Sequence, residues 1–65
     1  MKINLLFIEK KRKEKGLTMQ AMAELLGFKT APAYCNYEKG KREFRADMLP
    51  ILAHAFNCEI KDLYC

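Results

Sequence analysis

The sequence has little of what enzymes, small-molecule binding proteins and disulfide-rich domains depend on. It contains one histidine, three glycines, two prolines and no tryptophan. No glycine-rich stretch has the spacing of a phosphate-binding loop, and no nucleophile, base and acid form a recognisable catalytic set. A chain of 65 residues also leaves little room for a substrate pocket. We therefore expect no enzymatic activity, no cofactor and no small-molecule substrate.

Paired cysteines and long apolar runs are missing as well. Cys35, Cys58 and Cys65 are odd in number and show no paired spacing, which argues against a disulfide framework and favours a reducing compartment. His54 and Cys58 are four residues apart, but too few further ligands accompany them, so we expect no metal. The apolar stretch over residues 3–8 is far too short to span a membrane. We expect a cytoplasmic protein without membrane contact.

Charged residues, in contrast, are abundant and unevenly placed. The chain is 51% hydrophobic and 31% charged with a formal net charge of +4, which is typical of one folded globular domain over residues 1–65. Residues 9–15 carry five bases and two acids, residues 38–45 carry four bases and two acids, and the chain from residue 46 onward is net acidic. This distribution suits a protein that presents one face to a polyanion. Because a basic run can also be a solvated helix face, the charge distribution alone does not establish binding to a polyanion.

Helical periodicity dominates the sequence and predicts an all-α fold. The five expected helices cover about residues 3–15, 19–26, 31–39, 47–56 and 58–65. In the first helix, Leu5, Ile8 and Arg12 share one face. In the third, Tyr34 and Tyr37 are three residues apart, so we expect both to point inward.

Local signals mark the expected helix boundaries. Thr18 and Thr30 are suited to cap the second and third helices. The residues expected to end the first four helices are Gly16, Gly27, Gly40 and Asn57. Pro32 and Pro50 are expected in the first turns of the third and fourth helices, where a missing N–H does no harm.

The second and third helices, joined by a short turn containing Gly27, form an expected helix-turn-helix over about residues 18–39. A short helix, a tight turn and a second capped helix let one helix enter the major groove of DNA while the other rests on the backbone. Spacing alone is a weak signal, because many helical hairpins look like this.

Three segments together carry a more specific signal. LTMQAMAELLGF, TAPAYCNYEKGKR and MLPILAHAFNCEIKDLY resemble the Cro and phage-repressor type (XRE-like) of helix-turn-helix proteins, from about Ile8 to Tyr64. The resemblance implies a five-helix phage-repressor-like domain with a central helix-turn-helix, and a sequence-specific DNA-binding transcriptional regulator. The chain departs from the usual pattern in a turn one residue longer and in Met19, which stands where glutamine often contacts a phosphate.

The resemblance also implies that bases are read from the first half of the third helix. The expected base-contacting residues are Lys29, Thr30, Ala31, Pro32, Ala33 and Asn36. Asn36 is the best direct reader, because its amide can bond an adenine edge in two places. The alanines offer only apolar contact to thymine methyls, and the start of the helix lacks glutamine and arginine. Alternatively, the alanines serve helix propensity and specificity comes from DNA shape.

Phosphate contacts are expected beside this helix. The candidates are Thr18 and Gln20 at the start of the second helix and Lys39, Lys41, Arg42 and Arg45 in the loop after the third. The alternative is that this loop is merely solvated. The resemblance further implies that Arg12 pairs with Glu38 in a structural contact between the first and third helices.

Two functions are carried forward from the sequence. The first is a repressor that binds a palindromic operator in double-stranded DNA as a homodimer and blocks polymerase. Its dimer contact is expected at Ile60, Leu63, Tyr64 and Cys65, which leave more apolar surface than one short helix can bury, with a contribution from Phe44. The alternative is a helix-turn-helix fold that binds another protein in place of DNA, favoured by the weak base-reading chemistry of residues 31–33.

Overall fold

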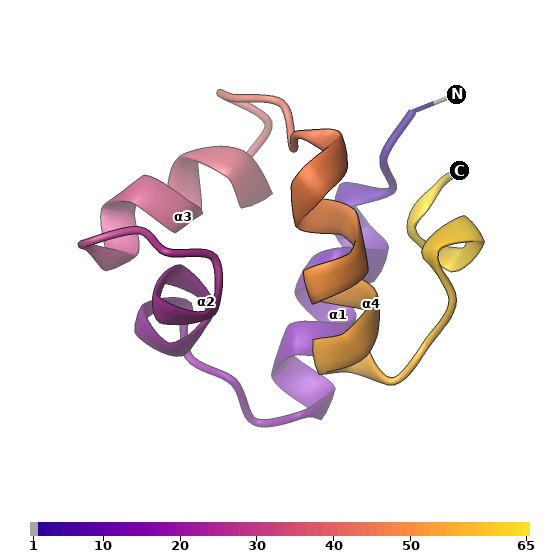
Figure 1. Ribbon diagram of the computed structural model, residues 1–65, viewed down its shortest axis with the longest axis horizontal. Coiled ribbons are helices and arrows are strands. Elements are labelled where there is room, and N and C mark those ends of the chain that lie inside the picture. Colours follow the sequence, from indigo (N-terminus) through magenta and orange to yellow (C-terminus); the bar gives the residue numbers. More distant parts are fainter. Residues whose placement is uncertain (1) are drawn as a thin grey trace.

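Four α-helices and two 3₁₀ turns follow one another in the computed structural model, which describes residues 2–65 (Figure 1). They are α1 (Leu5–Glu14), α2 (Met19–Leu25), α3 (Ala31–Glu38), η1 (Ala46–Met48), α4 (Leu49–Phe56) and η2 (Ile60–Leu63). The predicted all-α class is confirmed. Within the described residues, the one β-type contact is an isolated bridge between Ile3 and Tyr64. None of the helices in this range is long and apolar enough to cross a membrane.

The prediction of a fifth α-helix is wrong, because the end of the chain pairs with its beginning. The Asn4 N–H donates to the Leu63 carbonyl at 2.7 Å, and the Cys65 N–H donates to the Lys2 carbonyl at 2.9 Å. This pairing draws Tyr64 into an extended conformation, so only the short 3₁₀ turn η2 forms. The two ends of the described chain therefore lie side by side (Figure 1).

The same pairing moves the start of the first helix. Ile3 belongs to the bridge, and α1 begins after Asn4, whose side chain accepts a hydrogen bond from the Phe7 N–H at 3.1 Å. α4 also begins later than predicted, at Leu49, because η1 precedes it and Pro50 stands in its first turn. Thr30 is the N-cap residue of α3, but its side chain makes no capping hydrogen bond.

All four α-helices end in the same backbone arrangement. After α2, the Phe28 N–H donates to the Ala23 carbonyl and the Gly27 N–H to the Glu24 carbonyl, at 2.7 Å and 3.2 Å. This pair of bonds defines a Schellman motif, in which one residue has a positive φ. The residues in that position are Gly16, Gly27, Gly40 and Asn57, as the sequence predicted. The abrupt ends keep the connections short.

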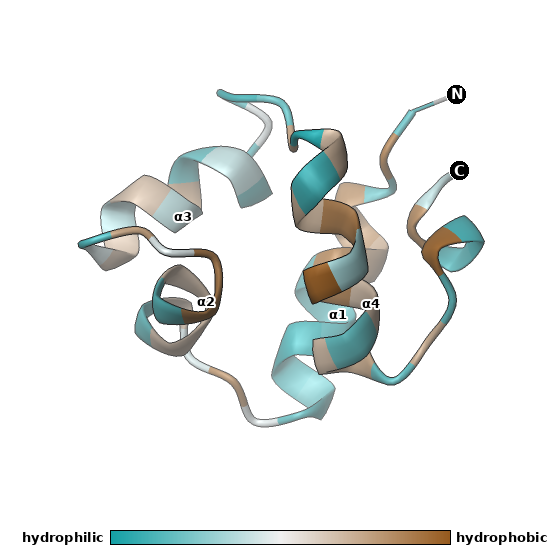
Figure 2. Ribbon diagram, in the orientation of Figure 1, coloured by the Kyte–Doolittle hydropathy of each residue, from teal (hydrophilic) through white to brown (hydrophobic). Residues whose placement is uncertain are grey.

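The core draws one or more side chains from every helix and turn. The largest fully buried side chains are Ile8, Met22, Tyr34, Met48, Leu52, Phe56 and Leu63. α4 contributes four buried residues, more than any other helix, and its strongly hydrophobic residues are brown in Figure 2. Tyr34 and Tyr37 are both buried, as predicted. Leu63 was expected at a dimer contact, but one chain buries it completely, so it is not available to a second chain.

Replacement of Asn57 tests the helix-ending conformation. Asn57 has φ 54° and ψ 50°, a left-handed conformation that side chains with a Cβ adopt at a cost. Asn57→Ala is expected to lower the free energy of unfolding by about 1 kcal/mol, and Asn57→Gly to leave it equal or higher. Urea denaturation followed by circular dichroism measures both. An alanine variant as stable as the wild type would contradict this account.

Candidate nucleic-acid interface

The helices α2 and α3 form a closely packed pair on one side of the molecule (Figure 1). α2 is capped by Thr18, whose hydroxyl accepts a hydrogen bond from the Ala21 N–H at 3.0 Å. Met22 and Ala23 from α2 and Tyr34 from α3 are buried together in the core. Since α2 has seven residues and α3 has eight, neither would be stable alone. Tertiary packing therefore sets how α3 is presented.

A row of aromatic rings fixes both loops that flank α3. Phe28, in the turn between α2 and α3, stacks on Tyr37 with ring centroids 5.0 Å apart and planes at 13°. The ring centroid of Phe44, in the loop after α3, lies 5.5 Å from that of Tyr37 and 6.3 Å from that of Tyr34. The sequence reading missed the role of Phe28. The sequence did contain a signal for this role, because Phe28 is a large aromatic residue in an otherwise polar turn. Such a ring is expected to pack against other apolar side chains.

The outer face of α3 carries two of the expected base-contacting residues, Pro32 and Asn36. Since Tyr34, Tyr37 and Glu38 are buried, the 3.6-residue period directs Pro32 and Asn36 outward. Lys29, Thr30 and Pro32 are exposed, and Ala31, Ala33 and Asn36 are half-buried. Within residues 2–65 the Asn36 side-chain amide makes no hydrogen bond. Its donors and acceptor are therefore free for a ligand.

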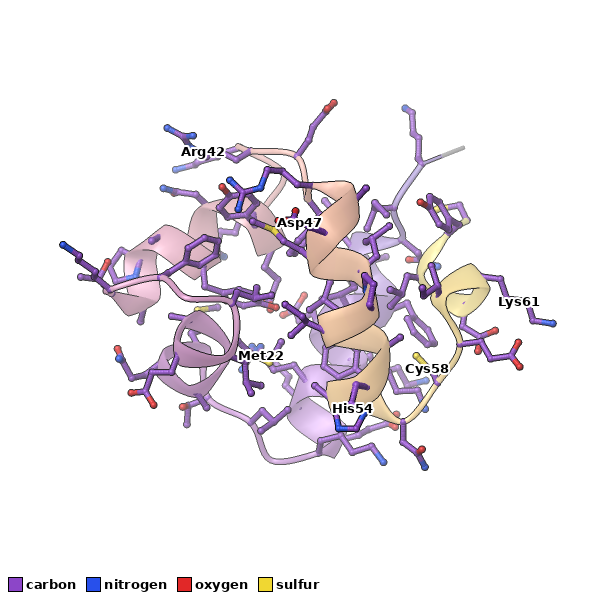
Figure 3. The ribbon with its side chains drawn as sticks, viewed as in Figure 1. Met22, Arg42, Asp47, His54, Cys58 and Lys61 are labelled. Carbon is purple, nitrogen blue, oxygen red and sulfur yellow. The ribbon has the colours of Figure 1, made fainter. Side chains whose placement is uncertain are left out.

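The loop after α3 holds its bases next to this face. Lys39, Lys41, Arg42 and Arg45 are all exposed, and Arg42 extends into solvent beside α3 (Figure 3). The backbone N–H groups of Lys41 and Arg42 both donate to the Asn36 carbonyl, at 2.9 Å and 3.2 Å, which anchors the loop to the helix. Arg45 is partly engaged by Asp47, with Nε 3.3 Å from the carboxylate.

The start of α2 supplies the remaining expected phosphate contacts. Thr18 and Gln20 are exposed, although Thr18 also caps its helix and the Gln20 amide donates to Glu24 at 3.2 Å. Met19, where the resemblance led us to expect a phosphate-contacting glutamine, packs against the core. It is therefore a packing residue in this chain.

A buried hydrogen-bond network joins α1 to α3. The Arg12 guanidinium donates to both oxygens of Glu38, from Nε at 2.9 Å and from Nη2 at 3.3 Å. The Arg12 Nη1 donates to the Leu17 carbonyl at 2.9 Å, and the Tyr34 hydroxyl donates to Glu38 at 2.7 Å. Arg12 is 8% exposed and Glu38 is 7% exposed. The pair inferred from the resemblance is thus present as a fork with both partners buried.

Burial and the hydrogen bond to Glu38 both raise the pKa of the Tyr34 hydroxyl well above its usual value. This hydroxyl therefore stays protonated at ordinary pH and keeps donating to the carboxylate. With the charge of Glu38 met by Arg12 inside the molecule, the exposed charge of residues 38–45 comes from four bases and Glu43.

The basic run over residues 9–15, on α1, differs from the loop after α3 because its charges are largely paired within the chain. Arg12 is buried, while Lys13 pairs with Glu9 at 3.0 Å and Lys11 pairs with Glu14 at 3.5 Å along the helix. The hydrogen bond and charge of Lys13 lower the pKa of the Glu9 carboxyl. Figure 2 shows this part of α1 as a strongly hydrophilic segment. This run is a solvated helix face, whereas the loop after α3 is the basic segment beside the outer face of α3.

The five residues expected at a dimer contact do not share one environment. Leu63 is buried in the core, as described above. Phe44 and Tyr64 are half-buried and line one cavity, Ile60 is 42% exposed, and Cys65 is exposed. All three cysteines are free, and within residues 2–65 no group of three or more His, Cys, Asp and Glu side chains could hold a metal ion.

Comparison with known proteins identifies the family. A family model described as helix-turn-helix matches residues 8–63. The chain therefore belongs to the Cro and phage-repressor type (XRE-like) of helix-turn-helix proteins, a family of DNA-binding transcription regulators. No curated protein and no solved structure matches it.

Removal of Arg12 tests the buried network. Arg12→Met leaves the Glu38 carboxylate buried without its cation, so we expect a loss of about 3–5 kcal/mol in the free energy of unfolding. Arg12→Met combined with Glu38→Gln removes both charges and keeps an acceptor for Tyr34, and it is expected to recover much of that loss. Urea denaturation measures both variants.

Lys13→Met provides the matched control, because it breaks the exposed pair with Glu9 and is expected to change stability little. If the single and double variants were equally unstable, Arg12 and Glu38 would not be coupled.

Proposed function

We propose that this protein is a sequence-specific transcriptional regulator in the cytoplasm, acting as a repressor that binds a palindromic operator as a homodimer. The observation that carries the proposal is the outer face of α3. It presents an unengaged Asn36 amide and is bordered by a loop with four exposed bases. α3 is proposed to enter the major groove while α2 and the loop rest on the DNA backbone.

Base reading is assigned first to Asn36. An asparagine amide can donate to N7-bearing adenine edges and accept from their amino group, a bidentate pair that other bases do not offer. Lys29 and Thr30 are the other polar candidates, at the exposed start of the helix. Ala31, Pro32 and Ala33 can add apolar contacts to thymine methyl groups. With so few polar readers, DNA shape is proposed to contribute much of the specificity.

Phosphate contacts are assigned to the exposed polar residues around α3. They are Thr18 and Gln20 from α2 and Lys39, Lys41, Arg42 and Arg45 from the loop after α3. Such contacts supply affinity and register without reading sequence, and they make binding depend on salt.

The size of the domain supports two copies on one operator. The longest extent of the described chain is 27 Å, whereas successive major-groove half-sites are about 34 Å apart. One copy therefore covers one half-site. Two copies related by a twofold axis would read an inverted repeat, and occupancy of such a site near a promoter blocks polymerase.

A second candidate function is a protein-interaction module. The observation in its favour is that the first turn of α3 presents alanine, proline and alanine, which are poor readers of base edges. In that case the surface of α3 would bind a protein, and DNA binding would be weak and independent of sequence.

Selection from a randomised DNA pool separates the two candidates. Bound sequences are enriched at low and at near-physiological salt, and their affinities are measured by fluorescence anisotropy. Enrichment of an inverted repeat, with affinity that falls steeply as salt rises, supports the regulator. Binding without enrichment, or no binding, supports the interaction module.

Paired variants test the assigned roles. Asn36→Ala is expected to cost about 1–3 kcal/mol at one base position in each half-site and to relax specificity there. Lys41→Gln is expected to weaken binding uniformly across sequences and to reduce the salt slope by about 1 for each bound copy. Anisotropy titrations on matched and mismatched operators measure both effects.

Lys10→Gln is the control for lost charge. Lys10 is exposed and lies two residues from buried Ile8, which places it on the side of α1 away from the core. An equal reduction of the salt slope by Lys10→Gln and Lys41→Gln would argue that the loop has no special role.

A further inference from the structure

Tyr37 on α3 combines a buried ring with a hydroxyl that has no partner among the described residues. The residue is only 8% exposed. Within residues 2–65 the Tyr37 hydroxyl makes no hydrogen bond, and every fully buried side-chain N or O atom in this range has a partner. The oxygen therefore belongs to the small part of Tyr37 that reaches the surface, where it is accessible to a ligand.

Packing alone does not account for this hydroxyl. Phenylalanine would fill the same space, and a buried tyrosine usually finds a partner for its O–H, because an unpaired hydroxyl is costly away from water. Tyr34 on the same helix follows that rule, since its hydroxyl donates to Glu38 at 2.7 Å. Tyr37 has no such partner within residues 2–65, which leaves its hydroxyl to solvent or to a ligand.

Two phenylalanines hold the Tyr37 ring beside the surface that is proposed to meet DNA. The ring of Phe28 stacks on it with centroids 5.0 Å apart, and the centroid of Phe44 lies 5.5 Å away. The turn that contains Phe28 also carries Lys29, and the loop that contains Phe44 carries the four exposed bases. These two segments adjoin the two ends of α3 (Figure 1). The ring is therefore fixed between the basic segments that border the outer face of α3.

We propose that the Tyr37 hydroxyl donates a hydrogen bond to a phosphate oxygen of the DNA backbone. Tyrosine is among the residues that make such contacts, and a backbone phosphate offers acceptors only. Because packing fixes the ring before DNA arrives, little side-chain freedom would be lost on binding. The proposal rests on the DNA binding of the proposed function and deepens it, since it adds a neutral and rigid donor to the charged contacts around α3.

Tyr37→Phe tests the contact, because it removes the hydroxyl and keeps the ring. Anisotropy titrations use the operator enriched from the randomised pool and, at low salt, a random-sequence duplex. The variant is expected to bind about tenfold more weakly for each bound copy, as for the loss of a hydrogen bond to a charged acceptor. Its salt slope is expected to equal that of the wild type, since a neutral side chain releases no counterion. Wild-type affinity in this variant would overturn the proposal.

The other two tyrosines provide matched controls. Tyr64→Phe removes a hydroxyl from the paired chain ends, away from the proposed DNA contacts, and is expected to leave DNA affinity unchanged. Tyr34→Phe breaks the bond to Glu38 and is expected to lower the urea midpoint of unfolding, whereas Tyr37→Phe is expected not to lower it. Equal losses of affinity in Tyr37→Phe and Tyr64→Phe, or a loss in Tyr37→Phe that accompanies lower stability, would overturn the proposal.

Methylphosphonate substitution locates the contacted phosphate. It replaces one charged oxygen of the DNA backbone with a methyl group, at one position of the duplex at a time. At the contacted phosphate, the loss of affinity from the substitution and Tyr37→Phe together is expected to be smaller than the product of the separate losses, because both changes act on the same hydrogen bond. Losses that multiply at every position would overturn the proposal.

The outcomes separate this contact from the proposed function. If Tyr37→Phe lost affinity for the random-sequence duplex and no operator were enriched, the phosphate contact would stand and the sequence-specific regulator would be refuted. If an operator were enriched and Tyr37→Phe bound it as tightly as the wild type, the regulator would stand and the phosphate contact would be refuted. A wild type that bound no DNA would overturn both.

Discussion

The Glu38 carboxylate accepts three hydrogen bonds inside the molecule, two from Arg12 and one from the Tyr34 hydroxyl. Removing these groups from water is expensive, so such a network adds little net stability compared with apolar packing. It does, however, fix one arrangement, because any rotation of α3 against α1 would leave a buried charge without its partner. The third donor of Arg12 extends the same constraint to the Leu17 carbonyl, just before α2 begins. The Glu38 carboxylate thus adds a directional constraint to the apolar packing that presents α3 to a ligand.

Helix ends were predictable from the sequence because their signals are local. Gly16, Gly27, Gly40 and Asn57 each allow the left-handed conformation within their own residue, and no distant contact is needed. The inward orientation of Tyr34 and Tyr37 also follows from helical spacing alone. The Arg12–Glu38 pair came from family resemblance, since nothing in the spacing of two residues on separate helices predicts it.

Features that depend on distant contacts were missed or wrong. The helix expected at residues 58–65 is replaced by a 3₁₀ turn because the Leu63 carbonyl is bonded to Asn4, at the other end of the chain. Apolar periodicity predicted that Leu63 is buried. It could not predict whether Leu63 is buried within its own chain or against a second one. Phe28 escaped notice because its stacking partner, Tyr37, lies on the next helix. For the proposed DNA contacts, the sequence supplied residue types, and the structure adds which of them are exposed and unengaged.

The pairing of the two chain ends has a consequence for the order in which the molecule folds and opens. Contacts within α2 and α3 join residues close in sequence, so they can form early with little loss of chain entropy. The bridge between Ile3 and Tyr64 closes a loop of almost the whole chain and rests on a few backbone bonds and on the packing of Leu63 in the core. It should therefore form late and open first, exposing its amides to hydrogen exchange while the helix pair is still intact. The chain ends would then fray without loss of the surface formed by α3.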